Sequence, residues 1–322
     1  MIIFFKFQIC GQFVRACSRS VNCKFRDWLL VGPRIHRHYL TSKEQEIQTE
    51  SGLITNDETQ QSNIIANFFK KMFLKKADQY PNIEPTKMQE PFGKEEVTEA
   101  VKNMRNGTSP GVDDIRIELV KYAPDEIHEQ IANIYNCVAE TGKHPLELTH
   151  GLIAPLQKPG KKRGPPENLR PITLLSILRK ILSVILMKKF RSRMKMRIPL
   201  NQAAYQSGRS TTEHTFAMKV AAEKTITSKT EELHVLLLDM SKAFDSINRK
   251  KLMQDFEEFL TKDELHLIQI MLKVNLQVKI KNVKSEPFET DTGAPQGDAK
   301  SAVEFILYLA NSVRKLTHRH EK

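Results

Sequence analysis

The apolar run at positions 233–238, interrupted only by His234 and ended by Asp239, is the feature that most constrains the fold. A short run without polar alternation predicts a central strand that is buried on both faces. A carboxylate at the end of such a strand is costly unless it is solvated, paired or bound to a metal ion. The segment alone leaves two interpretations of Asp239 open, a cap for the next helix and a metal ligand.

The rest of the chain mixes helical and strand patterns without a regular alternation of the two. This mixture predicts the α+β class. Apolar residues at helical spacing predict helices over residues 64–72, 95–104, 125–142, 174–189, 212–224 and 252–272. Shorter apolar or alternating runs predict strands over residues 152–156, 276–280 and 288–290. Arg179, Lys180, Lys188 and Lys189 fall on the charged face and at the end of the helix that begins near Leu174.

Basic residues are concentrated in one part of the chain. The 322 residues include 50 Lys and Arg against 38 Asp and Glu, a net charge of +12. Residues 151–200 contain thirteen basic residues and one acid, Glu167, so this block alone accounts for the net charge. Such a block indicates either a surface for a phosphate backbone or a solvated helix face, and the pattern leaves both open.

Four cysteines without a C-x-x-C pair fit a reducing, intracellular compartment, with nucleus and cytoplasm both open. Zinc binding by Cys10, Cys17 and Cys23 with a nearby histidine has the wrong spacing. The basic, acid-poor residues 1–40 resemble a weakly ordered tail more than a mitochondrial presequence. No apolar run approaches the ~18 residues of a membrane span, so we expect no membrane insertion.

Four segments, in order and at characteristic spacing, carry a family resemblance. They begin at Asn168-Leu-Arg-Pro-Ile, Gln202-Ala-Ala-Tyr-Gln, His234-Val-Leu-Leu-Leu-Asp and Thr292-Gly-Ala-Pro-Gln-Gly. Together they resemble the reverse transcriptases of non-LTR, LINE-like retrotransposons over residues 41–310, and the turn at 106–114 is similar to the one that opens that domain. The resemblance implies the fingers and partial palm of a right-hand polymerase, without the thumb.

The resemblance also divides the chain. After the basic tail at 1–40, which its composition indicates, the division is a helical segment with a proline-containing linker (41–94), a fingers-like region (95–232) and a partial palm (233–322).

The same resemblance implies roles for individual residues. Asp239 is similar to the first metal-binding carboxylate of the palm, with the Met240 carbonyl beside it, and two Mg²⁺ ions would activate the primer hydroxyl and stabilise the leaving pyrophosphate. Phe244 matches the aromatic residue that rejects ribonucleotides, although simple core packing is an alternative. The nucleotide-binding residues would be Lys158, Arg170, Phe244, Gln296 and Gly297, and the nucleic-acid contacts Lys161, Lys162, Arg163 and Arg209.

The family's second carboxylate motif, an aromatic-Ala-Asp-Asp hairpin, does not occur after Gly297. The pair Asp113-Asp114 lies in a Gly/Pro turn that precedes Asp239, so it is not the equivalent of this hairpin. We therefore expect a truncated, inactive part of an RNA-directed DNA polymerase, and as the alternative a nucleic-acid-binding module that does not polymerise. The implied partners are an RNA template with a DNA primer, or an RNA–DNA hybrid, and dNTP in the intact family. The oligomeric state is left open.

Overall fold

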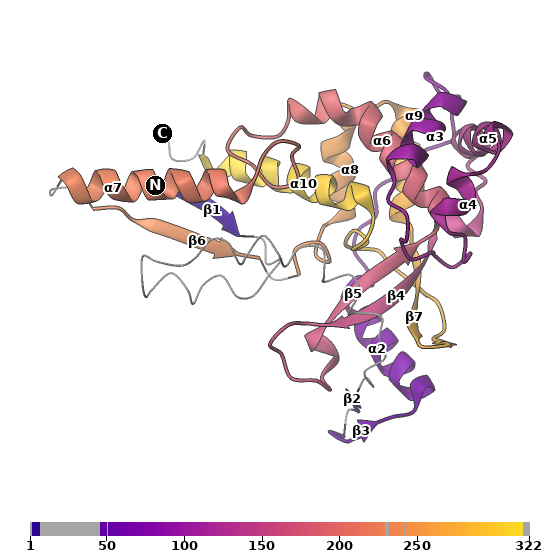
Figure 1. The fold of residues 1–322 in the computed structure, drawn as a ribbon, viewed down its shortest axis with the longest axis horizontal. Helices are drawn as coiled ribbons and strands as arrows, with labels where there is room; N and C mark the ends of the chain where they lie inside the picture. Colours follow the sequence, from indigo (N-terminus) through magenta and orange to yellow (C-terminus); the bar gives the residue numbers. More distant parts are fainter. Residues whose placement is uncertain (1, 7–45, 50, 229–231, 241, 318–322) are drawn as a thin grey trace.

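The computed structural model describes residues 2–6, 46–49, 51–228, 232–240 and 242–317. A five-stranded sheet lies between one helix and a body of seven helices (Figure 1). In this sheet β4 (His150–Gln157) pairs antiparallel with β5 (Leu169–Leu175) and parallel with β7 (Asn275–Ile280). Two short strands, β8 (Val283–Lys284) and β9 (Phe288–Glu289), pair antiparallel with β7. The mixed helix and sheet architecture agrees with the predicted α+β class.

Helix α2 (Glu58–Phe73) covers one face of the sheet. Its apolar side, including Ile65 and Phe69, packs on alternate buried residues of β7 such as Val278. Asp57 caps the helix, since its side chain accepts a hydrogen bond from the Gln60 amide over 2.9 Å. This helix confirms the one predicted from the spacing of residues 64–72. Two-residue strands β2 (Ile47–Gln48) and β3 (Ile54–Thr55) precede it.

The helical body encloses the larger hydrophobic core. It contains α3 (Lys94–Asn103), α4 (Ile117–Lys121), α5 (Asp125–Thr141), α6 (Ile177–Lys195), α8 (Arg249–Glu257), α9 (Lys262–Leu272) and α10 (Ala299–Thr317). The end of α5 lies where the sequence predicts it, whereas the stretch predicted as helical over residues 252–272 is divided between α8 and α9. Gly142 terminates α5 in the left-handed conformation at φ +68°, and Thr261 and Glu264 form a capping box at the start of α9.

The helix predicted over residues 174–189 begins later in the structure. Leu174 and Leu175 belong to strand β5, and α6 begins only after Ser176, whose side chain accepts a hydrogen bond from the Arg179 amide over 3.2 Å. The sequence analysis did not predict β5, because its last residues, Leu174 and Leu175, continue without a break into the apolar spacing of α6. This strand later proves essential to the candidate site.

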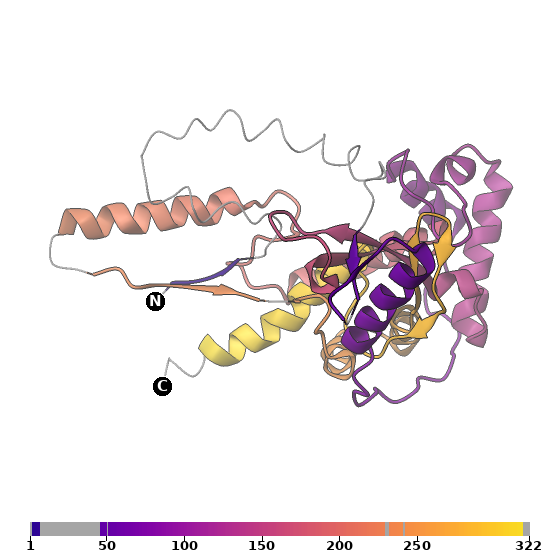
Figure 2. The same ribbon diagram turned by 90° about the horizontal axis from the view of Figure 1, so that it is seen from below.

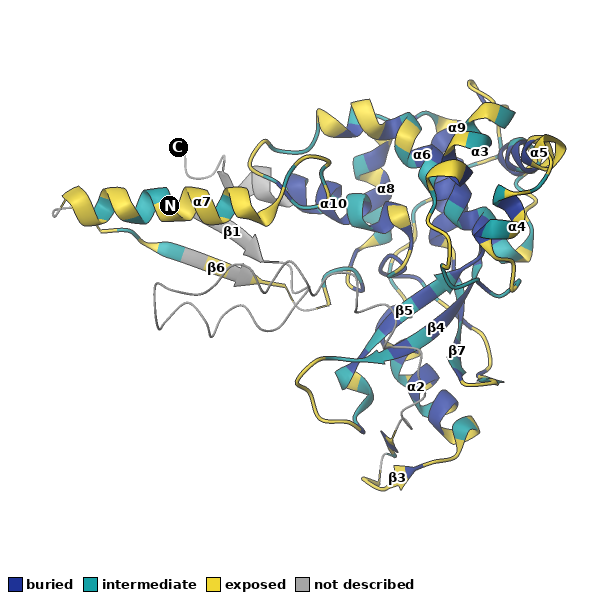
Figure 3. Cartoon of the chain, in the orientation of Figure 1, coloured by how far each residue is buried: buried dark blue, intermediate teal, exposed yellow. Residues whose placement is uncertain are grey.

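The strand predicted at 233–238 forms, but the prediction that it is a central strand buried on both faces is wrong. Strand β6 (Val235–Asp239) ends at Asp239 as predicted, but it pairs parallel with β1 (Ile2–Lys6) and not with the main sheet. Leu237 is 59% exposed, and Asp239 and Met240 are exposed as well. Strands β1 and β6 lie beside α7 (Thr211–Ser228), away from the helical body (Figures 1 and 2). No residue of α7 is buried (Figure 3).

The N-terminal segments differ from their predicted looseness. Residues 2–6 form a strand, whereas the rest of the predicted tail at 1–40 lies outside the described residues. The proline-containing stretch before α3 has no regular structure, but it packs along α9. The Ile83 amide donates to the Gln269 side chain over 2.9 Å, the Gln89 amide donates to Asp263 over 3.1 Å, and Phe92 is buried. None of the helices in the described part of the chain has the length and apolar character of a membrane span.

Candidate functional site

The turn at residues 292–298 lies backbone to backbone against the segment that follows β6. The Ala294 amide donates to the Phe244 carbonyl over 2.9 Å. Gly293 has φ of +76°, and a Cβ atom there would lie 2.8 Å from the Asp245 carbonyl oxygen, so only glycine allows this approach. Two motifs that are about fifty residues apart in the sequence therefore form one structural unit.

Strand β5 holds the same turn from the other side. The Thr173 amide donates to the Gln296 carbonyl over 2.7 Å. Gly297 has φ of +133°, and a Cβ atom there would lie 2.3 Å from the Thr173 carbonyl oxygen. A side chain at position 297 would force the turn away from the sheet. Gln296 and Gly297 are thus fixed at the surface of β5, with Gly297 exposed.

Asp245 is the buried centre of this unit. Its side chain accepts a hydrogen bond from the Gln296 side-chain amide, with 2.7 Å between Nε2 and Oδ1, and the residue is 5% exposed. Burial raises the pKa of Asp245 to about 6, against the opposing effects of Gln296, Lys158, Lys242 and, more weakly, Lys75. The carboxylate is therefore ionised at neutral pH.

Two predicted phosphate-binding residues lie in the same neighbourhood. Lys158 follows β4, and its ammonium group donates to the Glu167 carbonyl over 2.6 Å. Burial lowers the pKa of Lys158, Asp245 opposes this effect, and the nearby Arg170 adds to it. Arg170 lies on β5, where it pairs with Leu156 of β4. Lys158 thus lies in the electrostatic neighbourhood of Asp245, which contacts Gln296, and of Arg170.

Phe244 is half-buried beside this turn. Its ring packs against Phe305 of α10 with 5.2 Å between the ring centroids, and edge-on against Tyr205 at 6.4 Å. Packing thus accounts for part of the ring's surroundings. Its predicted role beside a nucleotide sugar stays a prediction.

The loop between β4 and β5 presents three exposed cations, Lys161, Lys162 and Arg163. The loop is held by its own polar side chains, since Gln157 donates to the Lys161 and Lys162 carbonyls over 3.2 Å and Asn168 donates to the Lys162 carbonyl over 3.0 Å. None of the ion pairs among the described residues involves these three cations. Their charge is directed to solvent beside Lys158.

The basic residues of α6 do not continue this surface, so neither of the two interpretations left open by the sequence describes the whole block over 151–200. Most pair with acids of neighbouring elements, and Lys180 donates to the Ser109 carbonyl over 2.9 Å. The pairs of α6 residues are Arg179–Asp298, Lys188–Glu99, Lys189–Glu96 and Arg193–Glu264, and Arg197, just after α6, pairs with Glu258. Only part of the basic block is therefore available to a polyanion.

Arg209 is also engaged within its own segment. Its guanidinium donates to Glu213 over 2.6 Å and to the Leu200 carbonyl over 2.8 Å. Both partners stabilise the turn that leads into α7. The predicted nucleic-acid contact of Arg209 gains no support from this arrangement and stays a prediction.

The predicted metal ligands do not join the unit around Asp245. Asp239 and Met240 lie at the exposed end of β6, away from the main sheet (Figure 1). Among the described residues, no three His, Cys, Asp or Glu side chains lie close enough together to hold a metal ion. The adjacent acids Asp113 and Asp114 lie in the turn before α4, as predicted.

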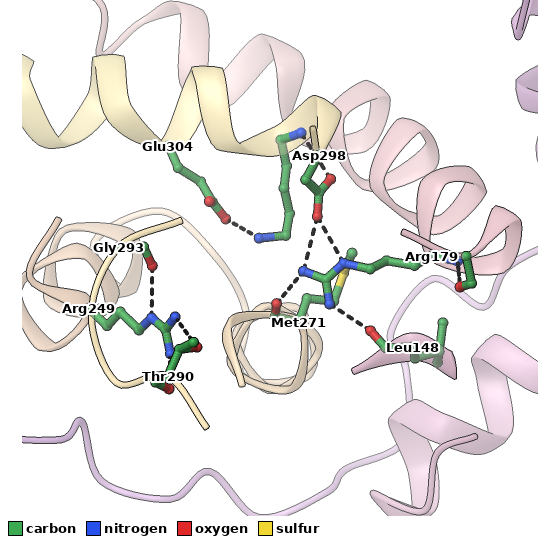
Figure 4. A network of polar contacts seen from close by, with 10 residues as sticks. Leu148, Arg179, Arg249, Met271, Thr290, Gly293, Asp298 and Glu304 are labelled. Atoms are coloured by element: carbon green, nitrogen blue, oxygen red, sulfur yellow. Dashed lines mark hydrogen bonds and ion pairs between the residues drawn. The ribbon is translucent and has the colours of Figure 1, made fainter. Parts of the chain in front are cut away.

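A buried ionic network that the sequence analysis missed anchors the far end of the turn (Figure 4). The Arg179 guanidinium, fully buried, contacts Asp298 at 3.0–3.1 Å and donates to the Leu148 and Met271 carbonyls over 2.6 and 2.5 Å. Burial alone would raise the pKa of Asp298, but Lys300 and Arg179 hold it below its usual value. Asp298 directly follows Gly297, so this network fixes the turn to three other elements.

Part of the network was visible in the sequence. Lys300 and Glu304 have the i,i+4 spacing that allows pairing on a helix, and their side chains do pair, with 2.7 Å between Nζ and Oε1 and both side chains buried. Arg179 lies three and seven residues before Leu182 and Leu186, which places it on the buried face of α6. That helical register is the signal that identifies Arg179 as internal.

Comparison with known proteins gives a consistent result. A family model described as reverse transcriptase (RNA-dependent DNA polymerase) matches residues 156–322. The chain is 25% identical over 284 residues to a "Probable RNA-directed DNA polymerase from transposon BS" of Drosophila melanogaster, covering 84% of this chain and 31% of that protein.

Two further relatives belong to the same class of mobile elements. The chain is 25% identical to the "Probable RNA-directed DNA polymerase from transposon X-element" of Drosophila melanogaster, over 68% of this chain and 24% of that protein. The "RNA-directed DNA polymerase from mobile element jockey" of Drosophila funebris is 23% identical over 69% and 24%. The chain thus spans about a quarter to a third of the length of these relatives.

Proposed function

Because the chain belongs to the reverse transcriptase (RNA-dependent DNA polymerase) family, we propose that it contributes template and nucleotide contacts to RNA-directed DNA synthesis. In this proposal residues 95–232 are the fingers region and residues 233–322 part of the palm. The partners are an RNA template with a DNA primer, or their hybrid, and an incoming dNTP. The names of the transposon relatives support this reading.

The observation that carries the proposal is the junction of the turn at 292–298 with β5 and with the Phe244–Asp245 segment. Asp245, which the Gln296 side chain contacts, lies in the electrostatic neighbourhood of Lys158, and Arg170 in turn lies in that of Lys158. In our proposal Arg170 offers a planar fork and Lys158 a point charge to the triphosphate. Phe244, Gln296 and Gly297 line the nucleoside.

The exposed cations Lys161, Lys162 and Arg163 would contact the phosphate backbone of the nucleic acid beside these residues. Arg209 is a further proposed contact that would have to leave Glu213. Mg²⁺ binding by Asp239 and Met240 remains a family-based prediction, because the described residues do not gather a metal-binding cluster.

One observation also favours the alternative, a nucleic-acid-binding module that does not polymerise. The cations of the β4–β5 loop are exposed and ordered, and they do not depend on Asp239 or on a metal ion. Binding of nucleic acid is therefore the property that both proposals share. Nucleotide binding separates them.

The test measures binding of dTTP to the chain saturated with an RNA–DNA hybrid that has a recessed DNA end. We expect Lys158→Gln with Arg170→Gln to weaken dTTP binding at least about tenfold, the loss of two charge-assisted contacts. The control pair is Arg191→Gln with Lys195→Gln, exposed residues of α6 without an ion pair among the described residues. Equal dTTP affinity in both variants would refute the nucleotide site and favour the alternative.

A further inference from the structure

The hydrogen bond between Asp245 and Gln296 has a fixed polarity. An ionised carboxylate only accepts hydrogen bonds, so the Gln296 side chain must turn its NH₂ group toward Asp245. The amide carbonyl oxygen then faces away from Asp245. Within the described part of the chain no protein group donates to this oxygen, and Gln296 is partly exposed. It is left available to a ligand.

We propose that Asp245 is a positioning residue that makes Gln296 present a hydrogen-bond acceptor, and not a donor, to the nucleotide or template strand beside the turn. This inference rests on the proposed function. The ligand group that fits is a donor, such as a sugar hydroxyl or a base amino group. Asp245 itself touches no ligand in this arrangement, because it is buried beneath the turn.

Cations from three separate segments keep Asp245 ionised. Lys158 follows β4, Lys242 follows β6, and Lys75 follows α2. Lys242 has a φ of +53°, in the left-handed region that non-glycine residues seldom adopt. Burial opposes ionisation and raises the pKa of Asp245 to about 6, so an asparagine of the same shape would fit the site more easily.

A double-mutant cycle tests whether Asp245 acts through Gln296. The probe is a fluorescein-labelled RNA–DNA hybrid with a template overhang, and the readout is anisotropy at pH 7.5. We expect Asp245→Asn and Gln296→Ala each to weaken binding about three- to tenfold, as for the loss of one hydrogen bond, because an asparagine lets Gln296 turn either way. The double variant should bind no more weakly than Gln296→Ala.

Electrostatics alone predicts the opposite sign for Asp245→Asn, since removing an acid strengthens attraction to a polyanion. Asp78→Asn removes the same charge at a position that is 85% exposed and serves as the matched control. We expect that control to bind as tightly as the wild type or more tightly. Additive losses in the cycle, or hybrid binding by Asp245→Asn that equals the control, would overturn the proposal.

The melting temperature separates positioning from a structural role. We expect Asp245→Asn to melt no lower than the wild type at pH 7.5, although it binds more weakly. A clearly lower melting temperature, large enough to explain the weaker binding, would show that Asp245 only supports the fold.

A second measurement keeps this inference distinct from the proposed function. The side-chain NH₂ signals of Gln296, assigned by their absence in Gln296→Glu, should shift in a single transition near pH 6 and lose that transition in Asp245→Asn. If the wild type binds no hybrid, the proposed function fails, and the signals still decide whether Asp245 orients Gln296. Signals that do not titrate would refute the positioning role.

Discussion

At the scale of single residues, Asp245 shows how one buried carboxylate links stability to pH. Its usual pKa of 3.8 is raised to about 6 in the folded chain, chiefly because burial disfavours the charged form. Between these two pH values the folded protein binds more protons at this position than the unfolded chain does. The contribution of Asp245 to stability therefore falls as the pH rises from about 4 to 6, and it stays low above that range.

Asparagine at position 245 carries no titrating group and removes this dependence. We expect the difference in melting temperature, Asp245→Asn minus wild type, to increase between pH 4.5 and 6.5 and then to level off. Differential scanning calorimetry at four pH values measures it. The Asp78→Asn difference, at an exposed position, should vary less over the same range. A difference for Asp245→Asn that is independent of pH would show that burial does not disfavour its charge.

At the scale of elements, the basic block at residues 151–200 divides into a part that is exposed and a part that is largely paired with acids. The cations of the β4–β5 loop face solvent, whereas most of those on α6 pair with acids on α3, on α9 or just before α10, and Arg191 and Lys195 stay exposed. An ion pair within the protein leaves little net field for a polyanion. The loop, more than the helix, should therefore set the salt dependence of nucleic-acid binding.

The triple change Lys161→Gln, Lys162→Gln and Arg163→Gln tests the loop. It should weaken hybrid binding on every sequence alike and reduce the log-affinity versus log-salt slope by roughly 0.7–0.9 for each lost phosphate contact. Anisotropy between 50 and 200 mM salt, the range over which such contacts act, measures the slope. Replacing Arg191, Lys195 and Lys224 by Gln removes the same charge from exposed positions elsewhere. If both triple variants give the same slope, the loop has no special role.

At the scale of the whole molecule, the Arg179–Asp298 pair connects parts of the chain that are distant in sequence. Arg179 begins α6, Asp298 precedes α10, and the carbonyls that Arg179 also bonds belong to Leu148 before β4 and to Met271 of α9 (Figure 4). The turn with Gln296 and Gly297 is attached to this junction. The geometry of the candidate site therefore depends on the assembly of the helical body.

Removing one member of the pair should be far more harmful than removing both. Arg179→Met leaves Asp298 charged, buried and unpaired, and we expect the free energy of unfolding to fall by about 3–5 kcal/mol. Adding Asp298→Asn to that variant should recover a large part of the loss, although the Leu148 and Met271 carbonyls stay without their donor. Urea unfolding of both variants measures the difference. A double variant that is no more stable than Arg179→Met would show that the two side chains are not coupled.

Much of the local structure followed from the sequence itself. Apolar spacing located α2, α5, α8, α9 and β7, and Gly142 ended α5 as predicted, because periodicity and backbone preference act over a few residues. The four motifs also indicated the family, and the family match confirms it. Residues such as Gln296 and Gly297 could be named as candidates from their motif alone.

The tertiary structure decided which of the candidates meet. Strand β5 was hidden by the adjoining helical pattern, Arg179 and Asp298 are paired across 119 residues of sequence, and the strand that ends at Asp239 lies on β1 and not in the main sheet. Local patterns record which face of an element is apolar, but they do not record which partner covers that face. Pairing over long sequence separations depends on how all the elements pack together, and that packing assigned Asp245, and not Asp239, to the turn with Gln296.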